Sequence, residues 1–90
     1  MPYYVYMLLT NHKRTYYSYV GYTNDLKRRL NYHNTSKGAK FTRGRSWKLI
    51  YKNSYDNKSS AIKNEYKLKK NRKKRLIIKN KFLKKLNLHK

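Results

Sequence analysis

Two runs of aromatic and β-branched residues lie close together near the start of the chain. The first covers residues 3–9, and the second, residues 15–22, follows after a short polar segment. Tyrosine and valine favour extended strands, and two such runs joined by a short loop pair as an antiparallel hairpin. A two-stranded hairpin alone is marginally stable in water, so the rest of the chain must supply elements that cover this sheet.

Three helices and one further strand are predicted to follow the hairpin. Thr23 or Asn24 is the expected cap of the first helix, with Asp25 in its first turn at the positive end of the helix dipole. Capping residues and apolar spacing predict a helix to about residue 34, a short strand over 47–51, a helix over about 56–70 and a basic helix over about 73–86. The order ββαβαα predicts an α+β fold in a single domain over residues 1–90.

The charge of the chain indicates its partners more than its fold. With 25 basic and 3 acidic residues, the net charge is +22, and nucleic acid is the polyanion that such a protein most commonly meets. The absence of cysteine excludes disulfides, thiol nucleophiles and cysteine-based zinc sites. The apolar runs are too short for a membrane span, and the first residues lack a signal-peptide pattern, so we expect an intracellular protein, cytoplasmic or associated with the nucleoid, with no membrane partner.

One of the three acids, Glu65, occupies an unusual position. Helical spacing of about 100° per residue places it on the same face as Ala61 and Leu68, in the apolar stripe of its helix. An unpaired charge there is costly. Two interpretations stay open: an ion pair with one of the many lysines and arginines, or a metal-binding carboxylate in a cleft. Asp25 and Asp56 need no such explanation, because both lie where helix starts favour acids.

The first predicted helix and the hairpin carry further polar groups on apolar faces. Arg29 and His33 are spaced i and i+4 beside the stripe of Leu26 and Leu30. A histidine there is ordinarily a core residue, but together with an arginine it can grip and protonate a phosphate. In the hairpin, strand alternation brings the phenols of two tyrosines side by side if their faces coincide, with a glycine that permits close backbone approach; these residues are Tyr6, Tyr19 and Gly21.

These residues resemble the GIY-YIG nuclease domain. Its paired tripeptides are similar to residues 4–6 and 19–21, and the similarity extends over about residues 3–80, which leaves 81–90 as a basic helix end or tail. The chain is most similar to the small stand-alone members and to the catalytic domain of the endonuclease that cuts branched DNA. The implied fold is a small three-stranded antiparallel sheet flanked by helices. Tyr4 replaces the first glycine of the family pattern, and this chain has no cysteine for the zinc domain of the branched-DNA enzyme.

The resemblance implies a metal-dependent endonuclease that hydrolyses DNA phosphodiester bonds in repair or recombination. Gly21 matches the family's glycine, and the catalytic positions correspond to Tyr6, Tyr19, Arg29, His33 and Glu65. Glu65 would bind one divalent metal, Mg²⁺ or Mn²⁺, since this ion needs few carboxylates, and Arg29 would neutralise charge on the phosphate. One of the two tyrosines would orient or deprotonate the water, with His33 assisting it or holding the phosphate; the sequence leaves both choices open.

Two basic clusters are predicted to bind the substrate. The first is Lys37, Lys40, Arg43 and Arg45, and the second is Lys69, Lys70, Arg72 and Lys73. The second lies in the segment 67–90, which contains 12 basic residues and no acid. Phe41 and Trp47 are candidates to stack or pack. We find no base-reading motif, so we expect selectivity for DNA structure, such as branched or single-strand-containing DNA, over sequence. A non-catalytic basic protein that binds DNA or RNA with the same fold is the alternative, and a protein partner or dimer stays open.

Overall fold

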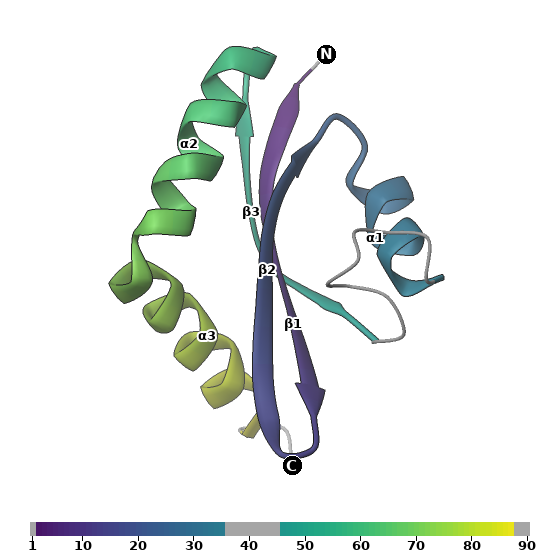
Figure 1. Ribbon diagram of the computed structural model, residues 1–90, viewed down its shortest axis with the longest axis vertical. Coiled ribbons are helices and arrows are strands. Elements are labelled where there is room, and N and C mark those ends of the chain that lie inside the picture. Colours follow the sequence, from purple (N-terminus) through teal and green to yellow (C-terminus); the bar gives the residue numbers. More distant parts are fainter. Residues whose placement is uncertain (1, 36–45, 88–90) are drawn as a thin grey trace.

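Three strands and three helices make up the part of the chain that the computed structural model describes, residues 2–35 and 46–87 (Figure 1). The bounds are β1 (Tyr3–His12), β2 (Thr15–Thr23), α1 (Leu26–Asn34), β3 (Lys48–Tyr55), α2 (Lys58–Lys70) and α3 (Arg72–Asn87). The predicted order and the α+β class are confirmed. Lys37, Lys40, Arg43, Arg45 and Phe41 lie outside the described residues.

The sheet has the order β2-β1-β3, and both pairs are antiparallel. Strand β1 lies in the centre and is buried continuously from residue 5 to residue 10, because helices cover both faces of the sheet. Figure 1 shows α2 and α3 on one face and α1 on the other. The register pairs Tyr6 with Gly21 and Leu8 with Tyr19, so these four side-chain positions share the α1 face.

Strand alternation divides the core into two clusters, one on each face of β1. Val5, Met7 and Val20 pack with Ala61 and Leu68 of α2. On the opposite face, the side chains of β1 pack with the start of β3 and with α1, in a cluster built from Tyr6, Leu8, Trp47, Leu26 and Leu30. The Trp47 side chain is 3% exposed, so of the two roles that the sequence left open for it, the structure shows packing.

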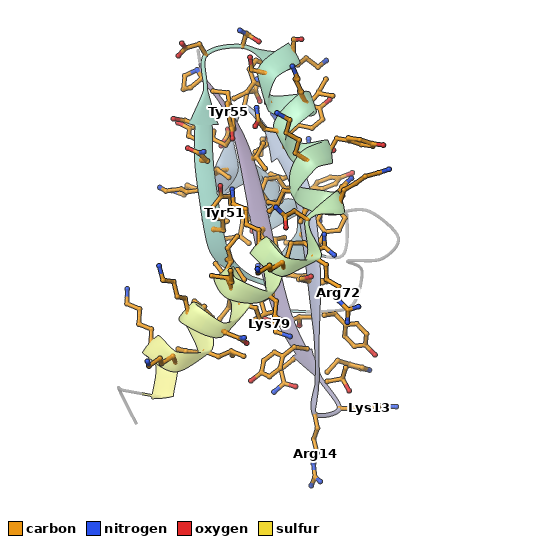
Figure 2. All side chains as sticks on the ribbon, turned by 90° about the vertical axis from the view of Figure 1, so that its left-hand side faces the viewer. Lys13, Arg14, Tyr51, Tyr55, Arg72 and Lys79 are labelled. Atoms are coloured by element: carbon orange, nitrogen blue, oxygen red, sulfur yellow. The ribbon has the colours of Figure 1, made fainter. Side chains whose placement is uncertain are left out.

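Strand β3 is longer than predicted and contains a bulge. Met7 pairs with Tyr51 whereas Leu8 pairs with Leu49, so Ile50 is the extra residue. The bulge lets both Ile50 and Tyr51 pack on the cluster beneath α2 and α3, and the strand then continues to Tyr55. Figure 2, viewed from the α2–α3 side, shows Tyr51 and Tyr55 on this face.

The helix starts use short polar side chains as expected, with one correction. Asp25 is itself the cap of α1, its carboxylate accepting from the Arg28 backbone N–H at 3.1 Å, whereas Thr23 or Asn24 was the expected cap. Thr23 instead supports the cap, because its hydroxyl accepts from the Asp25 N–H. Asn57 caps α2, within the predicted range. No helix in the described ranges is long and apolar enough to cross a membrane.

The hairpin between β1 and β2 closes through two residues, Lys13 and Arg14. His12 pairs with Thr15, and the two turn residues have φ of 49° and 68°. Positive φ at both positions defines the type I′ turn, which glycine and asparagine favour. A side chain with a Cβ in this left-handed region costs about 1–2 kcal/mol. The turn is therefore a strained point at the end of the hairpin.

Replacing Arg14 by glycine should stabilise the protein. Arg14→Gly relieves the left-handed strain, and we expect the free energy of unfolding to rise by about 1 kcal/mol, which raises Tm by roughly 4–8 °C in a domain of this size. Arg14→Ala is the matched control, since it removes the same charge but keeps a Cβ. Thermal melts in which both variants gain equally would assign the effect to charge and contradict the strain argument.

Candidate active site

The site begins with the contact between Tyr6 in β1 and Gly21 in β2. A Cβ added at Gly21 would lie 2.5 Å from the Tyr6 hydroxyl oxygen and 2.7 Å from its ring carbon Cζ. The Tyr6 ring therefore occupies the space that any other residue at position 21 would fill. The close approach predicted at this glycine is made by the tyrosine side chain across the strand pair.

The Tyr6 hydroxyl is hydrogen-bonded to His33 of α1, with 3.0 Å between Oη and Nε2. His33 is 1% exposed, and Tyr6 is 3% exposed. Burial lowers the pKa of the imidazole, and the nearby Arg29 guanidinium lowers it further. Burial raises the pKa of the Tyr6 phenol, with Tyr19 adding to the rise and Arg29 opposing it. At neutral pH the pair therefore consists of a neutral imidazole and a protonated phenol.

The second tyrosine lies against the same pair. The Tyr19 ring centroid is 5.0 Å from that of His33 and 6.4 Å from that of Tyr6. The two strand faces, whose coincidence the sequence left as a condition, do coincide, and both phenols lie on the α1 side of the hairpin. Tyr19 is half-buried.

Arg29 lies one helical turn before His33 and is exposed at the rim of the site. Its guanidinium is 5.7 Å from the centroid of the Tyr32 ring, a cation–π contact. Arg29 and His33 were both expected on or beside the buried stripe. In the structure their exposure differs: the His33 imidazole is in the core, and the Arg29 guanidinium is accessible. Only the guanidinium is in a position to meet a phosphate from solvent.

Glu65 reaches the site from α2, on the other side of the sheet. Its side chain is 16% exposed, and Oε1 is 3.3 Å from Nζ of Lys69, the next turn of the helix. The ion pair that the sequence left open is therefore present. The carboxylate also lines a pocket of about 420 Å³ beside the edge strand, together with Tyr6, Tyr19, Gly21, Arg29 and residues 22–24.

The pocket brings four predicted side chains together from four elements, β1, β2, α1 and α2. Tyr6, Tyr19, Arg29 and Glu65 line it, whereas His33 stands behind Tyr6. Lys58, at the start of α2, also lines this pocket and was missed, since nothing in the sequence distinguishes it from other surface lysines. A second pocket of about 300 Å³ adjoins it and shares Thr23, Asn24 and Arg29.

Asn34, which the sequence did not mark as a site residue, holds the end of α1 in place. The Asn34 side-chain amide accepts from the Trp47 N–H at 2.6 Å and donates to the Trp47 carbonyl at 3.1 Å. These two bonds tie the helix that carries Arg29 and His33 to the start of β3. An asparagine at the end of a helix gives no sequence signal for such a long-range contact.

The second predicted binding cluster is exposed at the junction of α2 and α3. Lys69 is paired with Glu65, and Lys70 lies 4.9 Å from the centroid of the Tyr66 ring. Arg72 and Lys73 are exposed at the start of α3, and Figure 2 shows Arg72 at this junction. The cluster therefore follows directly after the carboxylate of the site.

The donor set of the pocket is compatible with one hard divalent ion. Within residues 2–35 and 46–87, no group of three or more His, Cys, Asp or Glu side chains is placed to hold a metal. Mg²⁺ commonly binds through one or two carboxylates, keeps several waters and takes phosphate oxygens from the substrate. A single half-buried carboxylate, Glu65, fits that mode, and a closed protein cage is not required.

Comparison with known proteins gives a match over most of the chain. The profile of the GIY-YIG catalytic domain matches residues 2–82. A UPF0213 protein of Oceanobacillus iheyensis is 50% identical over 52 residues, which are 57% of this chain and 60% of that protein. A UPF0213 protein of Streptococcus agalactiae is 54% identical over 48 residues, covering 52% of this chain and 54% of the relative. The chain thus spans three-fifths or less of the length of these two relatives.

Among solved structures, the solution NMR structure of a UPF0213 protein from Bacillus halodurans is similar. It shares 36% sequence identity, and the match covers 86% of this chain and 83% of that chain, with a TM-score of 0.44.

The buried imidazole should make stability depend on pH. Because the pKa of His33 is lowered on folding, the unfolded chain binds the extra proton first, and stability is lost as pH falls below the ordinary histidine value of about 6.5. We expect Tm to fall between pH 7 and pH 5, and His33→Gln to reduce that fall. His12→Gln, at an exposed position, is the control. An unchanged pH dependence in His33→Gln would contradict the assignment.

Proposed function

The chain belongs to the GIY-YIG family of nuclease domains, and from this premise we propose that it is a metal-dependent endonuclease that hydrolyses DNA phosphodiester bonds. One observation carries the proposal: Tyr6, Tyr19, Arg29 and Glu65 converge on a single pocket from both faces of the sheet. Phosphodiester hydrolysis needs an activated water and stabilisation of charge on the phosphate. The pocket offers candidate groups for each task.

Activation of the water is assigned to the Tyr6–His33 pair. In the tautomer we assign, Nε2 of His33 carries no proton, so the Tyr6 hydroxyl donates to it and the phenol oxygen can accept a hydrogen bond from a water in the pocket. As the water oxygen bonds to phosphorus, one of its O–H bonds breaks and the proton passes to Oη, while the original phenol proton passes to Nε2. The P–O bond to the leaving sugar oxygen breaks, and that oxygen takes a proton from solvent. The phenol is thus restored, and the imidazole behind it becomes positively charged. His33 is too deeply buried to hold the phosphate itself.

The negative charge on the phosphate is stabilised from two sides of the pocket. Arg29 is exposed at the rim and offers its guanidinium to the phosphate oxygens. A Mg²⁺ or Mn²⁺ ion bound by Glu65 would supply Lewis-acid stabilisation of the developing charge. Lys69, which pairs with Glu65, adds a positive charge beside the carboxylate. Tyr19 borders the same pocket and orients the water or the phosphate.

Substrate binding is assigned to the basic surface around this pocket. The net charge of +22 favours contacts with the DNA backbone, and Lys69, Lys70, Arg72 and Lys73 follow the catalytic carboxylate. We assign the same role, contact with the DNA backbone, to the first predicted cluster, Lys37, Lys40, Arg43 and Arg45. Such contacts do not read bases, so selectivity is for DNA structure, such as branched or single-strand-containing DNA. The proposed role is in DNA repair or recombination, inside the cell and at the nucleoid.

A second candidate function is a DNA- or RNA-binding protein without catalysis. The observation in its favour is the ion pair between Glu65 and Lys69, which gives the carboxylate a structural partner. Both functions predict tight and salt-sensitive binding, so affinity does not separate them. Turnover that depends on a metal and on Glu65 does.

Glu65→Gln should abolish cleavage while leaving DNA affinity nearly unchanged. The assay uses supercoiled plasmid and a labelled branched duplex, with Mg²⁺ or with EDTA. Lys69→Gln is the matched control, because it breaks the same ion pair but keeps the carboxylate, and it should still cleave. Either change should cost only about 0.3–0.5 kcal/mol of stability. Loss of folding in Glu65→Gln, seen by circular dichroism, or cleavage by it would contradict the assignment; binding without any cleavage by wild-type protein would favour the second function.

Tyr6→Phe and Tyr19→Phe should separate the two phenols. If Tyr6 passes the proton to His33, Tyr6→Phe should lower the cleavage rate by about 10²–10⁴-fold, the usual contribution of a general base. Tyr19→Phe, which removes an orienting group, should lower it less. The rates are measured in single-turnover reactions with the branched duplex. The reverse order of the two losses would move the base to Tyr19.

A further inference from the structure

The tip of the β1–β2 hairpin combines backbone strain with exposed cations. Lys13 and Arg14 have positive φ, and Figure 2 shows both side chains extending from the end of the hairpin, away from the helices. All residues from 11 to 16 are exposed, and Tyr16 is 42% exposed. The three acids of the chain, Asp25, Asp56 and Glu65, lie in other segments. The tip is therefore positively charged and accessible from several directions.

The strain at the turn is informative, because a residue type that would relieve it is common in this sequence. Asparagine tolerates the left-handed conformation, and the chain contains 10 asparagines, yet none occupies the turn. Lysine and arginine are instead found at both positions, where each costs about 1–2 kcal/mol of conformational energy. Residues kept in an unfavourable backbone conformation occur preferentially at functional sites. Their shared property here is a long cationic side chain.

Strand β2 connects this tip to the pocket along one edge of the sheet. It is an edge strand in the order β2-β1-β3, and its residues 19 and 21–23 line the pocket. Gly21 lies seven positions after Arg14. At about 3.3 Å per residue this is roughly 23 Å, the length of about seven base pairs at about 3.4 Å each.

We propose that Lys13 and Arg14 bind the phosphate backbone of double-stranded DNA about seven base pairs from the phosphate in the pocket. The duplex lies along the β2 edge, with the pocket at one end and the tip at the other. Between them β2 presents hydroxyl and aromatic side chains and no charged residue, so the two contact points are distinct. The contact makes the hairpin a rigid spacer that favours a duplex arm of sufficient length. This inference rests on the proposed function for the position of the scissile phosphate.

The test measures binding in EDTA, where no cleavage occurs, to a labelled forked DNA with a 16-base-pair arm. The variant Lys13→Asn/Arg14→Gly removes both charges and installs the preferred type I′ turn, so it should fold at least as stably as wild type. We expect it to bind about tenfold more weakly or worse at 0.1 M salt, and to lower the slope of log K against log salt by about 2. The control Lys48→Thr/Lys52→Thr removes two exposed charges from β3, on the opposite edge, and should lose less.

Neutral methylphosphonate linkages then locate the contact. With the phosphate at the fork in the pocket, linkages about seven base pairs along the arm should weaken binding of the wild-type protein but not weaken the tip variant further. Linkages about 12 base pairs along the arm should affect neither protein. The inference would be overturned if the tip variant and the β3 variant lost equal affinity for the DNA. It would also be overturned if the modified DNA weakened binding of the wild-type protein and of the tip variant equally. Cleavage is measured separately with Mg²⁺. If the tip variant binds more weakly but the wild-type protein does not cleave, only the proposed function is overturned. If the wild-type protein cleaves but the tip variant binds as tightly as wild type, only this inference is overturned.

Discussion

The hydrogen bond between Tyr6 and His33 is the contact on which the rest of the site depends. A buried phenol and a buried imidazole each need a partner, because an unsatisfied polar group in the core is costly. Here each satisfies the other across 3.0 Å, and Gly21 leaves the space in which they meet. The bond fixes α1 against the sheet. Arg29, one turn earlier on that helix, is thereby placed at the rim of the pocket.

The pocket draws on both faces of a very small sheet, and this is possible only at an edge. Arg29 comes from α1 and Glu65 from α2, which cover opposite faces of the sheet (Figure 1). In the middle of the sheet the strands would separate them. Beside β2, an edge strand with a glycine at the critical position, both side chains border the same space. The arrangement gives a strongly basic protein one carboxylate at the place where its positive charge would meet a phosphate.

Much of the fold and of the site was predictable from local patterns. Strand alternation placed Tyr6 and Tyr19 each on a definite face of its strand. Helical spacing placed Arg29 and His33 on or beside the buried stripe of their helix, and Glu65 in the apolar stripe of another. Several local details differ from the prediction, among them the end of β1, which continues past residue 9 to His12. Three consecutive residues, 23–25, are all capable of capping, and Asp25 is the one that does. The third strand continues to Tyr55, beyond its predicted end, and a bulge at Ile50, which alternation does not predict, changes which side chains face the core.

The sequence by itself determined the elements, the faces they bury and the family, because periodicity and motif spacing are properties of the chain alone. The tertiary structure decided which side chains contact one another and which are exposed. Nothing in the local sequence indicates that His33 bonds to Tyr6, that Asn34 holds the backbone of Trp47, or that Arg29 is exposed while His33 is buried. These outcomes depend on how segments distant in the sequence pack together, since a buried polar group takes the partner that packing brings within reach.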